Sequence, residues 1–238
     1  MIELRDPVSS LSHLLTAIWA VFATALMYRL APQPSRTVAM IYGMSMVLLY
    51  TASGLFHGLY YESTAQHRLF QKLDQSAIYL LIAGTNTPIM AILLPRRWRR
   101  WFLGGVWLMA CLGIASLWAL PKPPHTLVVG VYLAMGWIGI IPIRWYYQAL
   151  GARAMNWAWL GAACYTFGAV CELSRWPVLI PGWIGPHEVL HFCDSAGSLA
   201  FFVFIVRHVL LRPGASPSGI SGKYPVLPTH FISQNRLC

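Results

Sequence analysis

Five polar residues stand at spacings that suit metal chemistry in a sequence that is otherwise strongly apolar. His187 and His191 lie four residues apart in the segment HEVLH, so on a helix both side chains would share one face. Ser53 and His57 have the same spacing, and Asp74 follows His57 by seventeen residues. Polar side chains are costly inside membrane-spanning segments, which makes each of them a functional candidate.

Three imidazoles and a carboxylate form a donor set that zinc accepts. Zinc binds neutral imidazole nitrogen, and catalytic zinc sites use three protein ligands and leave one position open. His57, His187 and His191 are the candidate ligands. Asp74 is the candidate for holding or deprotonating the reacting water, while Ser53 is the candidate for orienting that water or for donating to an oxyanion.

Glu188 offers an alternative base, because HEVLH matches the H-E-x-x-H pattern of metalloproteases. Its side chain could equally face the headgroup region or hydrogen-bond a neighbour. An intramembrane metalloprotease of the site-2 type would also need a downstream Asp-Gly-type motif, and none follows. We therefore prefer Asp74 as the base.

Two further acidic residues have structural and functional interpretations. Glu172 could support the site, although a local ion pair with Arg175 is favoured by their spacing of three. Asp194 lies three residues after His191 and could either orient a ligand histidine or make a hydrogen bond between packed helices.

The composition defines the elements that must position these residues. The chain has 238 residues, 57% of them hydrophobic and only 10% charged, whereas soluble domains have about 25% charged residues. A membrane-spanning helix needs about 20 apolar residues. We expect seven such helices, at about residues 10–29, 37–59, 75–94, 101–120, 126–147, 155–174 and 187–210. The sequence predicts an all-α, polytopic seven-transmembrane bundle within residues 1–211, followed by a flexible polar tail at 212–238.

Alternating crossings would bring the candidate residues together. The second helix runs across the membrane in one direction, and the third and seventh run in the other. His57 near the end of the second helix, Asp74 at the opening of the third and His187 near the start of the seventh should therefore meet at one membrane face.

The basic excess concerns the membrane rather than nucleic acid. Lys and Arg number 17 against 7 Asp and Glu, and basic residues flank membrane helices at cytoplasmic ends and beside anionic lipid. Membrane lipids are thus the expected partners, and no nucleic acid is expected. Twelve of the 17 fall on the side opposite the N-terminus, which by the positive-inside rule places the N-terminus outside.

Three segments resemble the hemolysin III group of the progestin and adipoQ receptor family: SGLFH at 53–57, KLDQSAIYLLIAGTNTP at 72–88 and HEVLHFCDSAG at 187–197. They occur in the family's order on the second, third and seventh helices, and the resemblance covers about residues 10–210. It implies a seven-helix bundle with zinc on the three histidines, the Asp74 carboxylate near the water on zinc, and Ser53 close by. It also implies a cytoplasmic N-terminus, which conflicts with the charge count and leaves the orientation open.

The resemblance leads to three functional hypotheses. The wider superfamily is similar to alkaline ceramidases, which suggests a zinc-dependent hydrolase of a lipid amide or ester in the cell membrane. The name hemolysin III suggests instead a pore-forming or lytic protein in which zinc only joins helices. A receptor-like sensor without catalysis is the third. An open fourth zinc position would favour the hydrolase, and a water pathway through the whole bundle would favour the pore.

Overall fold

Within residues 4–120 and 123–212, which the computed structural model describes, the chain is almost entirely helical. Its α-helices are α1 (Pro7–Leu30), α2 (Gln33–Gly58), α3 (Thr64–Leu93), α4 (Arg96–Ala119), α5 (His125–Trp137), α6 (Ile143–Ser174) and α7 (Pro186–Phe204). A short 3-10 helix, η1 (Ile138–Ile140), follows α5, and a π-helix, η2 (Ile205–Leu210), extends α7. In the described part of the chain, β structure is limited to one isolated bridge. The predicted tail lies outside the described residues except for its first residue, Arg212.

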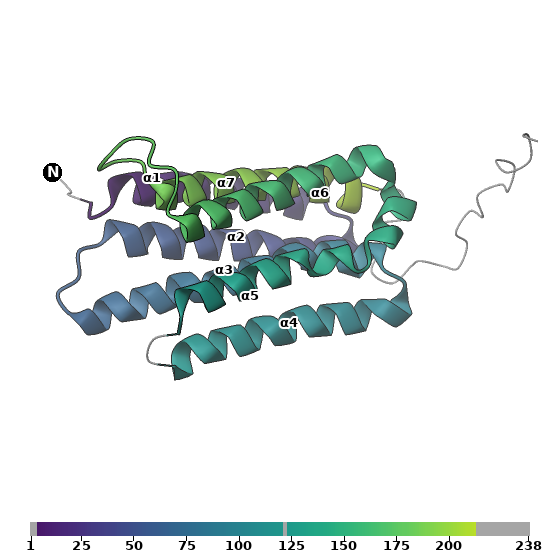
Figure 1. Ribbon diagram of the computed structural model, residues 1–238. Helices are drawn as coiled ribbons and strands as arrows, with labels where there is room; N and C mark the ends of the chain where they lie inside the picture. The colour runs from purple at the N-terminus through teal and green to yellow at the C-terminus, as the bar shows by residue number, and fades with distance from the viewer. Residues whose placement is uncertain (1–3, 121–122, 213–238) are drawn as a thin grey trace, which may run out of the picture.

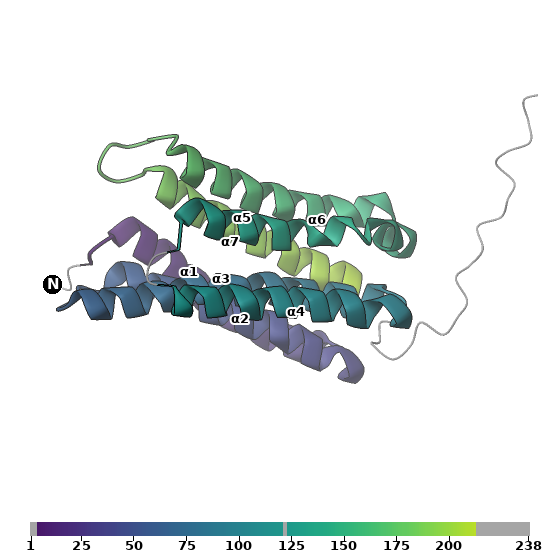
Figure 2. The ribbon, with the colours of Figure 1, turned by 60° about the horizontal axis from the view of Figure 1, so that its bottom comes forward.

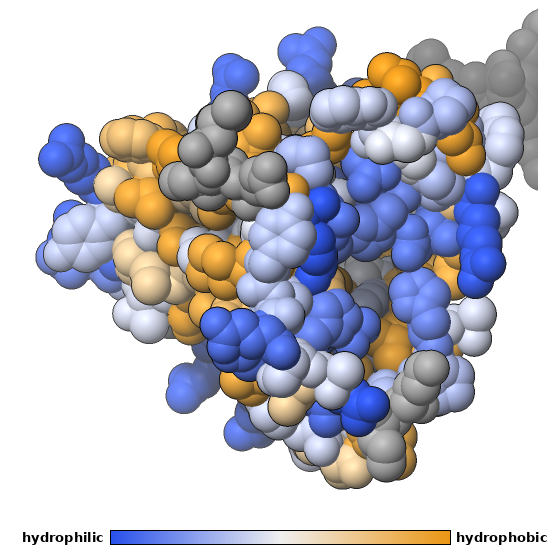
Figure 3. Space-filling model, turned by 90° about the vertical axis from the view of Figure 1, so that its left-hand side faces the viewer, coloured by the Kyte–Doolittle hydropathy of each residue, from blue (hydrophilic) through white to orange (hydrophobic). Residues whose placement is uncertain are grey.

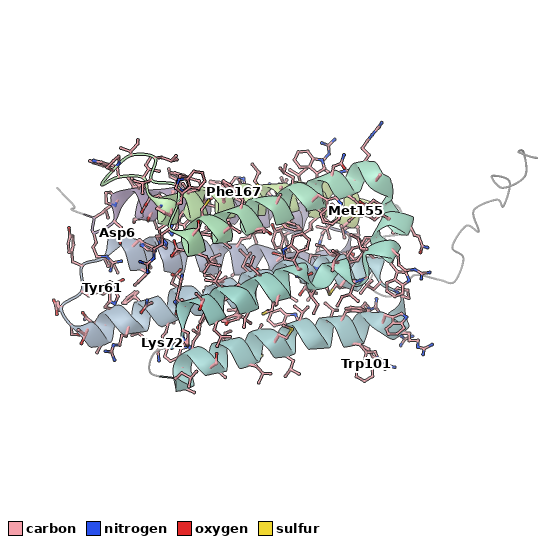
Figure 4. The ribbon with its side chains drawn as sticks, viewed as in Figure 1. Asp6, Tyr61, Lys72, Trp101, Met155 and Phe167 are labelled. Carbon is pink, nitrogen blue, oxygen red and sulfur yellow. The ribbon has the colours of Figure 1, made fainter. Side chains whose placement is uncertain are left out.

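Consecutive helices lie side by side and alternate in direction (Figure 1). The starts of α1, α3, α5 and α7 therefore lie at the same end as the ends of α2, α4 and α6, and we call this the N-terminal end of the bundle. A view from another side shows the loop between α6 and α7 at this end as well (Figure 2). Asp6 and Tyr61 lie at the N-terminal end, whereas Trp101 and Met155 lie toward the opposite one (Figure 4).

Helix α3 forms the centre of the bundle, since most of its residues from Ser76 onward are buried. Small residues let its neighbours pack closely, as is common between membrane helices. A Cβ added to Gly54 of α2 would meet the Leu14 side chain of α1 at 2.7 Å. A Cβ added to Gly168 of α6 would meet Cys193 of α7 at 2.8 Å. These close approaches bring α1 against α2 and α6 against α7.

The outer surface of the bundle carries large apolar side chains, among them Leu15, Phe22, Leu112 and Phe167. By length and hydropathy, five of the described helices could each cross a membrane, and a sixth span results if the bent pair α5 and α6 counts as one. This confirms an all-α, polytopic membrane protein with seven helices. Seven complete crossings remain a prediction.

Two predicted boundaries were wrong because polar residues extend a helix beyond its apolar stretch. Helix α3 begins at Thr64, where the Ser63 hydroxyl caps it by accepting from the Gln66 amide, rather than near residue 75. Asp74 consequently lies in the third turn of α3 and does not open it. Helix α4 likewise begins at Arg96 and includes the basic cluster that was assigned to a loop.

The predicted fifth and sixth spans also differ from the structure. Instead of one helix over 126–147, α5 ends at Trp137, and Pro142, which cannot donate a backbone hydrogen bond, precedes α6. The two helices are bent by 74° at this point. The loop predicted near residues 148–155 is part of α6 instead. Only Gly151 departs from helical geometry there, with a φ of 75° that glycine adopts readily because it has no Cβ.

We expect Glu62 and Pro181 to lie on one side of the membrane and Trp98 on the other. The test introduces single cysteines at these positions after the five natural cysteines have been replaced, and it labels intact membrane vesicles with an impermeant thiol reagent. Labelling of Glu62→Cys and Pro181→Cys from one side, and of Trp98→Cys only from the other, is expected. Labelling of all three from the same side would refute the alternating topology.

Candidate metal centre

Three histidine side chains meet at the N-terminal end of the bundle. His57 comes from the last turn of α2, and His187 and His191 come from the first two turns of α7. The Nε2 atom of His187 lies 3.2 Å from Nε2 of His57 and 3.2 Å from Nε2 of His191. His57 and His191 are 5% and 3% exposed, while His187 is partly exposed. This confirms that the alternating helices bring the three candidate ligands together.

The opposite nitrogen of each ring is held by an oxygen from another helix or its flanking segment. Nδ1 of His57 lies 3.2 Å from the Asp6 carboxylate, and Nδ1 of His187 lies 3.3 Å from the Glu172 carboxylate. Nδ1 of His191 lies 3.2 Å from the Ser9 carbonyl oxygen. Ionised carboxylates and carbonyls only accept hydrogen bonds, so a neutral ring at each of these positions donates its Nδ1 proton and presents an unprotonated Nε2.

This arrangement fits a metal cation. Three unprotonated Nε2 atoms cannot hydrogen-bond one another, and at 3.2 Å their lone pairs would repel unless a cation lay between them. In the described part of the chain, these three residues form the cluster of His, Cys, Asp and Glu ligand atoms that could hold a metal. Carboxylate or carbonyl partners on the outer nitrogen are usual for metal-binding histidines, because they fix the tautomer and the ring orientation.

Asp74 and Ser53 lie beside the histidines without belonging to the triad. The Asp74 carboxylate accepts a hydrogen bond from the Ser53 hydroxyl and lies within electrostatic range of His187. Its oxygens are not part of the cluster of potential ligand atoms. Ser53 therefore holds Asp74 in place.

Asp6 was not identified as a site residue from the sequence, although it lies next to His57. Arg5 donates to the Asp6 carboxylate at 2.9 Å, and the Asp6 amide donates to the His57 carbonyl at 2.9 Å. Partial burial would raise the pKa of Asp6, but hydrogen bonds from Arg5 and His57 outweigh it and lower the pKa below its ordinary value. The same alternation of helices that placed His57 here would have placed the residues before α1 at this end.

His13 of α1 is a second residue that the sequence interpretation missed. Its ring stacks on that of His191 with a centroid distance of 3.8 Å, and its Nε2 lies 3.3 Å from the His191 carbonyl oxygen. His13 is buried, so it limits the movement of His191 from the side opposite the triad. Nothing in its position in the sequence distinguished it from a core histidine.

The structure agrees with the hydrogen-bonding alternative for Glu188, whereas the local ion pair favoured for Glu172 is not among those of the described residues. Both oxygens of Glu188 are occupied at the start of α7, one by the Ser9 hydroxyl and the other by the Gly185 amide. Glu172 forms its closest contacts with His187 and, at 3.5 Å, with His125, and the described ion pairs do not include one with Arg175. Asp194 makes no described hydrogen bond from its carboxylate to a histidine.

The centre opens onto a cavity of about 210 Å³ between α2, α3, α5, α6 and α7. Asp74, Glu172, His187 and Asp194 line it together with mostly apolar side chains. Viewed onto the N-terminal end, hydrophilic side chains surround a hollow in the middle of the molecule (Figure 3). His187 is therefore the member of the triad that faces this mainly apolar space.

Fold and site together define an integral membrane protein, all-α, with a histidine triad that could bind a metal. The family profile described as Haemolysin-III related matches residues 2–202. The chain thus belongs to the haemolysin III family, within the progestin and adipoQ receptor family, and is located in the cell membrane.

Relatives from bacteria and animals are similar to the chain. The Hemolysin-3 homolog of Bacillus subtilis (strain 168) is 32% identical over 73% of this chain and 78% of its own length. Hemolysin-3 of Bacillus cereus is 33% identical over 71% and 74%. The Adiponectin receptor protein of Drosophila melanogaster is 27% identical over 66% of this chain, but over only 39% of its own length.

Loss of a carboxylate that contacts the Nδ1 atom of a ligand histidine should weaken metal binding without abolishing it. We expect Asp6→Ala and Glu172→Ala each to lower metal affinity by about 10- to 100-fold, because the ring they orient becomes free to rotate. Competition with a chromogenic chelator measures the affinity of the purified protein. Glu62→Gln, in the exposed loop at the same end, is the control and should bind as the wild type does. Unchanged affinity in both alanine variants would contradict the assigned partners.

Proposed function

We propose that the protein is a zinc-dependent integral-membrane hydrolase of a lipid amide or ester. The observation that carries the proposal is that Asp74 and His187, a member of the histidine triad, both line a mainly apolar cavity. A site with this combination could hold a lipid with its carbonyl group at the metal and its chain in the apolar space.

Zinc is the metal that the donor set favours. Its bonds to imidazole nitrogen are about 2.0–2.1 Å long, and tetrahedral angles then place two such nitrogens about 3.3 Å apart. The observed separations of 3.2 Å agree with this value. His57, His187 and His191 would hold zinc through Nε2.

When bound there, zinc supplies a Lewis acid that polarises a carbonyl and acidifies water at neutral pH. Proton transfer and the positioning of the ligands would fall to residues of the chain. Asp74 would accept the proton from the attacking water and deliver it to the leaving group. Ser53 donates a hydrogen bond to Asp74 and would so position that carboxylate, and orienting the water or donating to an oxyanion stays a prediction for Ser53. Asp6 and Glu172 keep two ligand rings in position.

The cavity supports a chain-like substrate. A second cavity of about 80 Å³ adjoins the first, and both are lined by Asn86, Trp137 and Phe201. The combined space leads from the triad toward the opposite end of the bundle, which suits an extended acyl chain. Membrane lipids are thus the proposed partners, and nucleic acid is not among them.

A lytic or pore-forming role is the competing proposal, and it comes from the name Hemolysin-3 carried by the two Bacillus relatives. In that case zinc would join α2 to α7 without taking part in catalysis. The mainly apolar lining of the cavities is less suited to a water path and favours the hydrolase.

The purified protein should contain about one zinc ion per chain. Elemental analysis of the wild type and of the double variant His187→Ala/His191→Ala tests this, because the double variant removes two of three ligands. We expect the double variant to lose the zinc. Wild-type zinc content in the double variant would show that the metal lies elsewhere.

Asp74→Asn should retain much of the zinc but lose hydrolysis of a ceramide-like amide. Removing a general base typically costs about 10²–10⁴ in rate, whereas the amide side chain leaves all three histidines intact. Turnover is measured with a chain-labelled amide in mixed micelles.

Glu188→Gln is the control for Asp74→Asn, and it should cost far less, because both Glu188 oxygens are occupied at the start of α7. The reverse order would favour a protease-like base. Absence of zinc-dependent turnover with any lipid amide or ester, together with liposome leakage that survives both substitutions, would support the lytic role instead.

A further inference from the structure

Asp194 is an acidic residue of the cavity that the proposed reaction does not use. Four residues of α7 line the cavity: His187, Leu190, Asp194 and Phe201. The last three follow His187 by three, seven and fourteen residues, so all four lie on one face of the helix. Asp194 lies seven residues after His187, or about 10 Å deeper along the helix at 1.5 Å per residue. It therefore belongs to the apolar part of the cavity, beyond the triad.

The Asp194 carboxylate lacks a protein partner within the described part of the chain. Of the three carboxylates that line the cavity, Asp74 accepts from Ser53 and Glu172 contacts two histidines. The hydrogen bonds and ion pairs of the described residues include none to the Asp194 carboxylate, and no Lys or Arg lines the cavity. An unpaired carboxylate at this depth is costly, so a functional reason for it is expected.

Hydrogen bonds from α2 fix the α7 backbone around Asp194 on the side away from the cavity. The Tyr50 hydroxyl of α2 donates to the Asp194 carbonyl at 2.8 Å and to the Ser198 hydroxyl at 2.6 Å. The Tyr42 hydroxyl donates to the Ser198 carbonyl at 3.0 Å. These bonds fix one side of α7 to α2, while the carboxylate on the cavity side is left without a bond.

From this arrangement we infer that Asp194 forms a second polar subsite, which accepts a hydrogen bond from a hydroxyl group on the chain of the lipid ligand. The inference rests on the proposed function in taking a lipid amide or ester as the ligand. A hydroxyl several bonds from the carbonyl would reach Asp194 while the carbonyl lies at the triad. An acceptor-only or anionic group at the same place would meet a carboxylate and be disfavoured. Asp194 is thus a specificity residue for hydroxylated lipids.

Ligand binding tests this subsite separately from turnover. The probes are a saturated long-chain N-alkyl amide and a series of the same amide with one hydroxyl at increasing distance from the amide group, up to and beyond the separation of about 10 Å between His187 and Asp194 along α7. Dissociation constants are measured with the purified full chain in detergent micelles. We expect at least one hydroxylated amide to bind about 10- to 100-fold more tightly than the parent amide, as for a hydrogen bond to a charged group.

Variants at and beside Asp194 assign the effect. Asp194→Leu should reduce the preference to less than about 3-fold, and Asp194→Asn, which keeps an acceptor oxygen, should retain part of it. Ser195→Ala is the matched control, because its hydroxyl faces Thr16 of α1 and the His191 carbonyl rather than the cavity. The control should keep the full preference.

Thermal unfolding separates recognition from a structural role. Asp194→Leu should melt at or above the wild-type temperature, since it removes an unpaired, partly buried carboxylate. The inference fails if no hydroxylated amide binds more tightly than the parent, if Asp194→Leu keeps the preference, or if that variant loses both the preference and stability. A preference that depends on Asp194 without any turnover would sustain the subsite and refute the hydrolase.

Discussion

The need to pair three imidazoles, two of them buried, on both ring nitrogens governs the N-terminal end of this bundle. Each Nδ1 lies within hydrogen-bond distance of an oxygen from another part of the chain, and the three Nε2 atoms lie together in one cluster. Because the acceptors come from residues before and within α1 and from α6, the site ties four parts of the chain together. If any of these helices moved, a ring would lose the bond that fixes its tautomer.

The remaining bundle has to supply that rigidity without a hydrophobic driving force between helices, since lipid is as apolar as the helix surfaces. Small residues supply it by letting backbones approach, as Gly54 does between α2 and α1 and Gly168 does between α6 and α7. Hydroxyl groups of Tyr42 and Tyr50 add polar bonds between α2 and α7. The two helices that carry the histidines are thus joined along their length, not only at the triad.

The family assignment and the description of the metal centre rest on different observations. The family follows from similarity that extends over most of the chain. The metal centre follows from donor atoms, tautomers and distances. Asp194 illustrates the difference, because its interest comes from an unpaired carboxylate in a cavity and not from the similarity. A relative with an apolar residue at that position would share the triad and lack the proposed subsite.

The sequence by itself determined the helical membrane architecture and the three candidate ligands, because apolar run length and alternating direction suffice to place His57 and His187 at one face. It could not place Asp6 or His13, whose roles depend on contacts between segments far apart in the chain. It also placed Asp74 at a helix start, since hydropathy marks the apolar span but not a polar first turn capped by Ser63. Tertiary structure alone decided which oxygen meets each imidazole, because hydrogen-bond partners are set by packing in three dimensions and leave no periodic signal in the sequence.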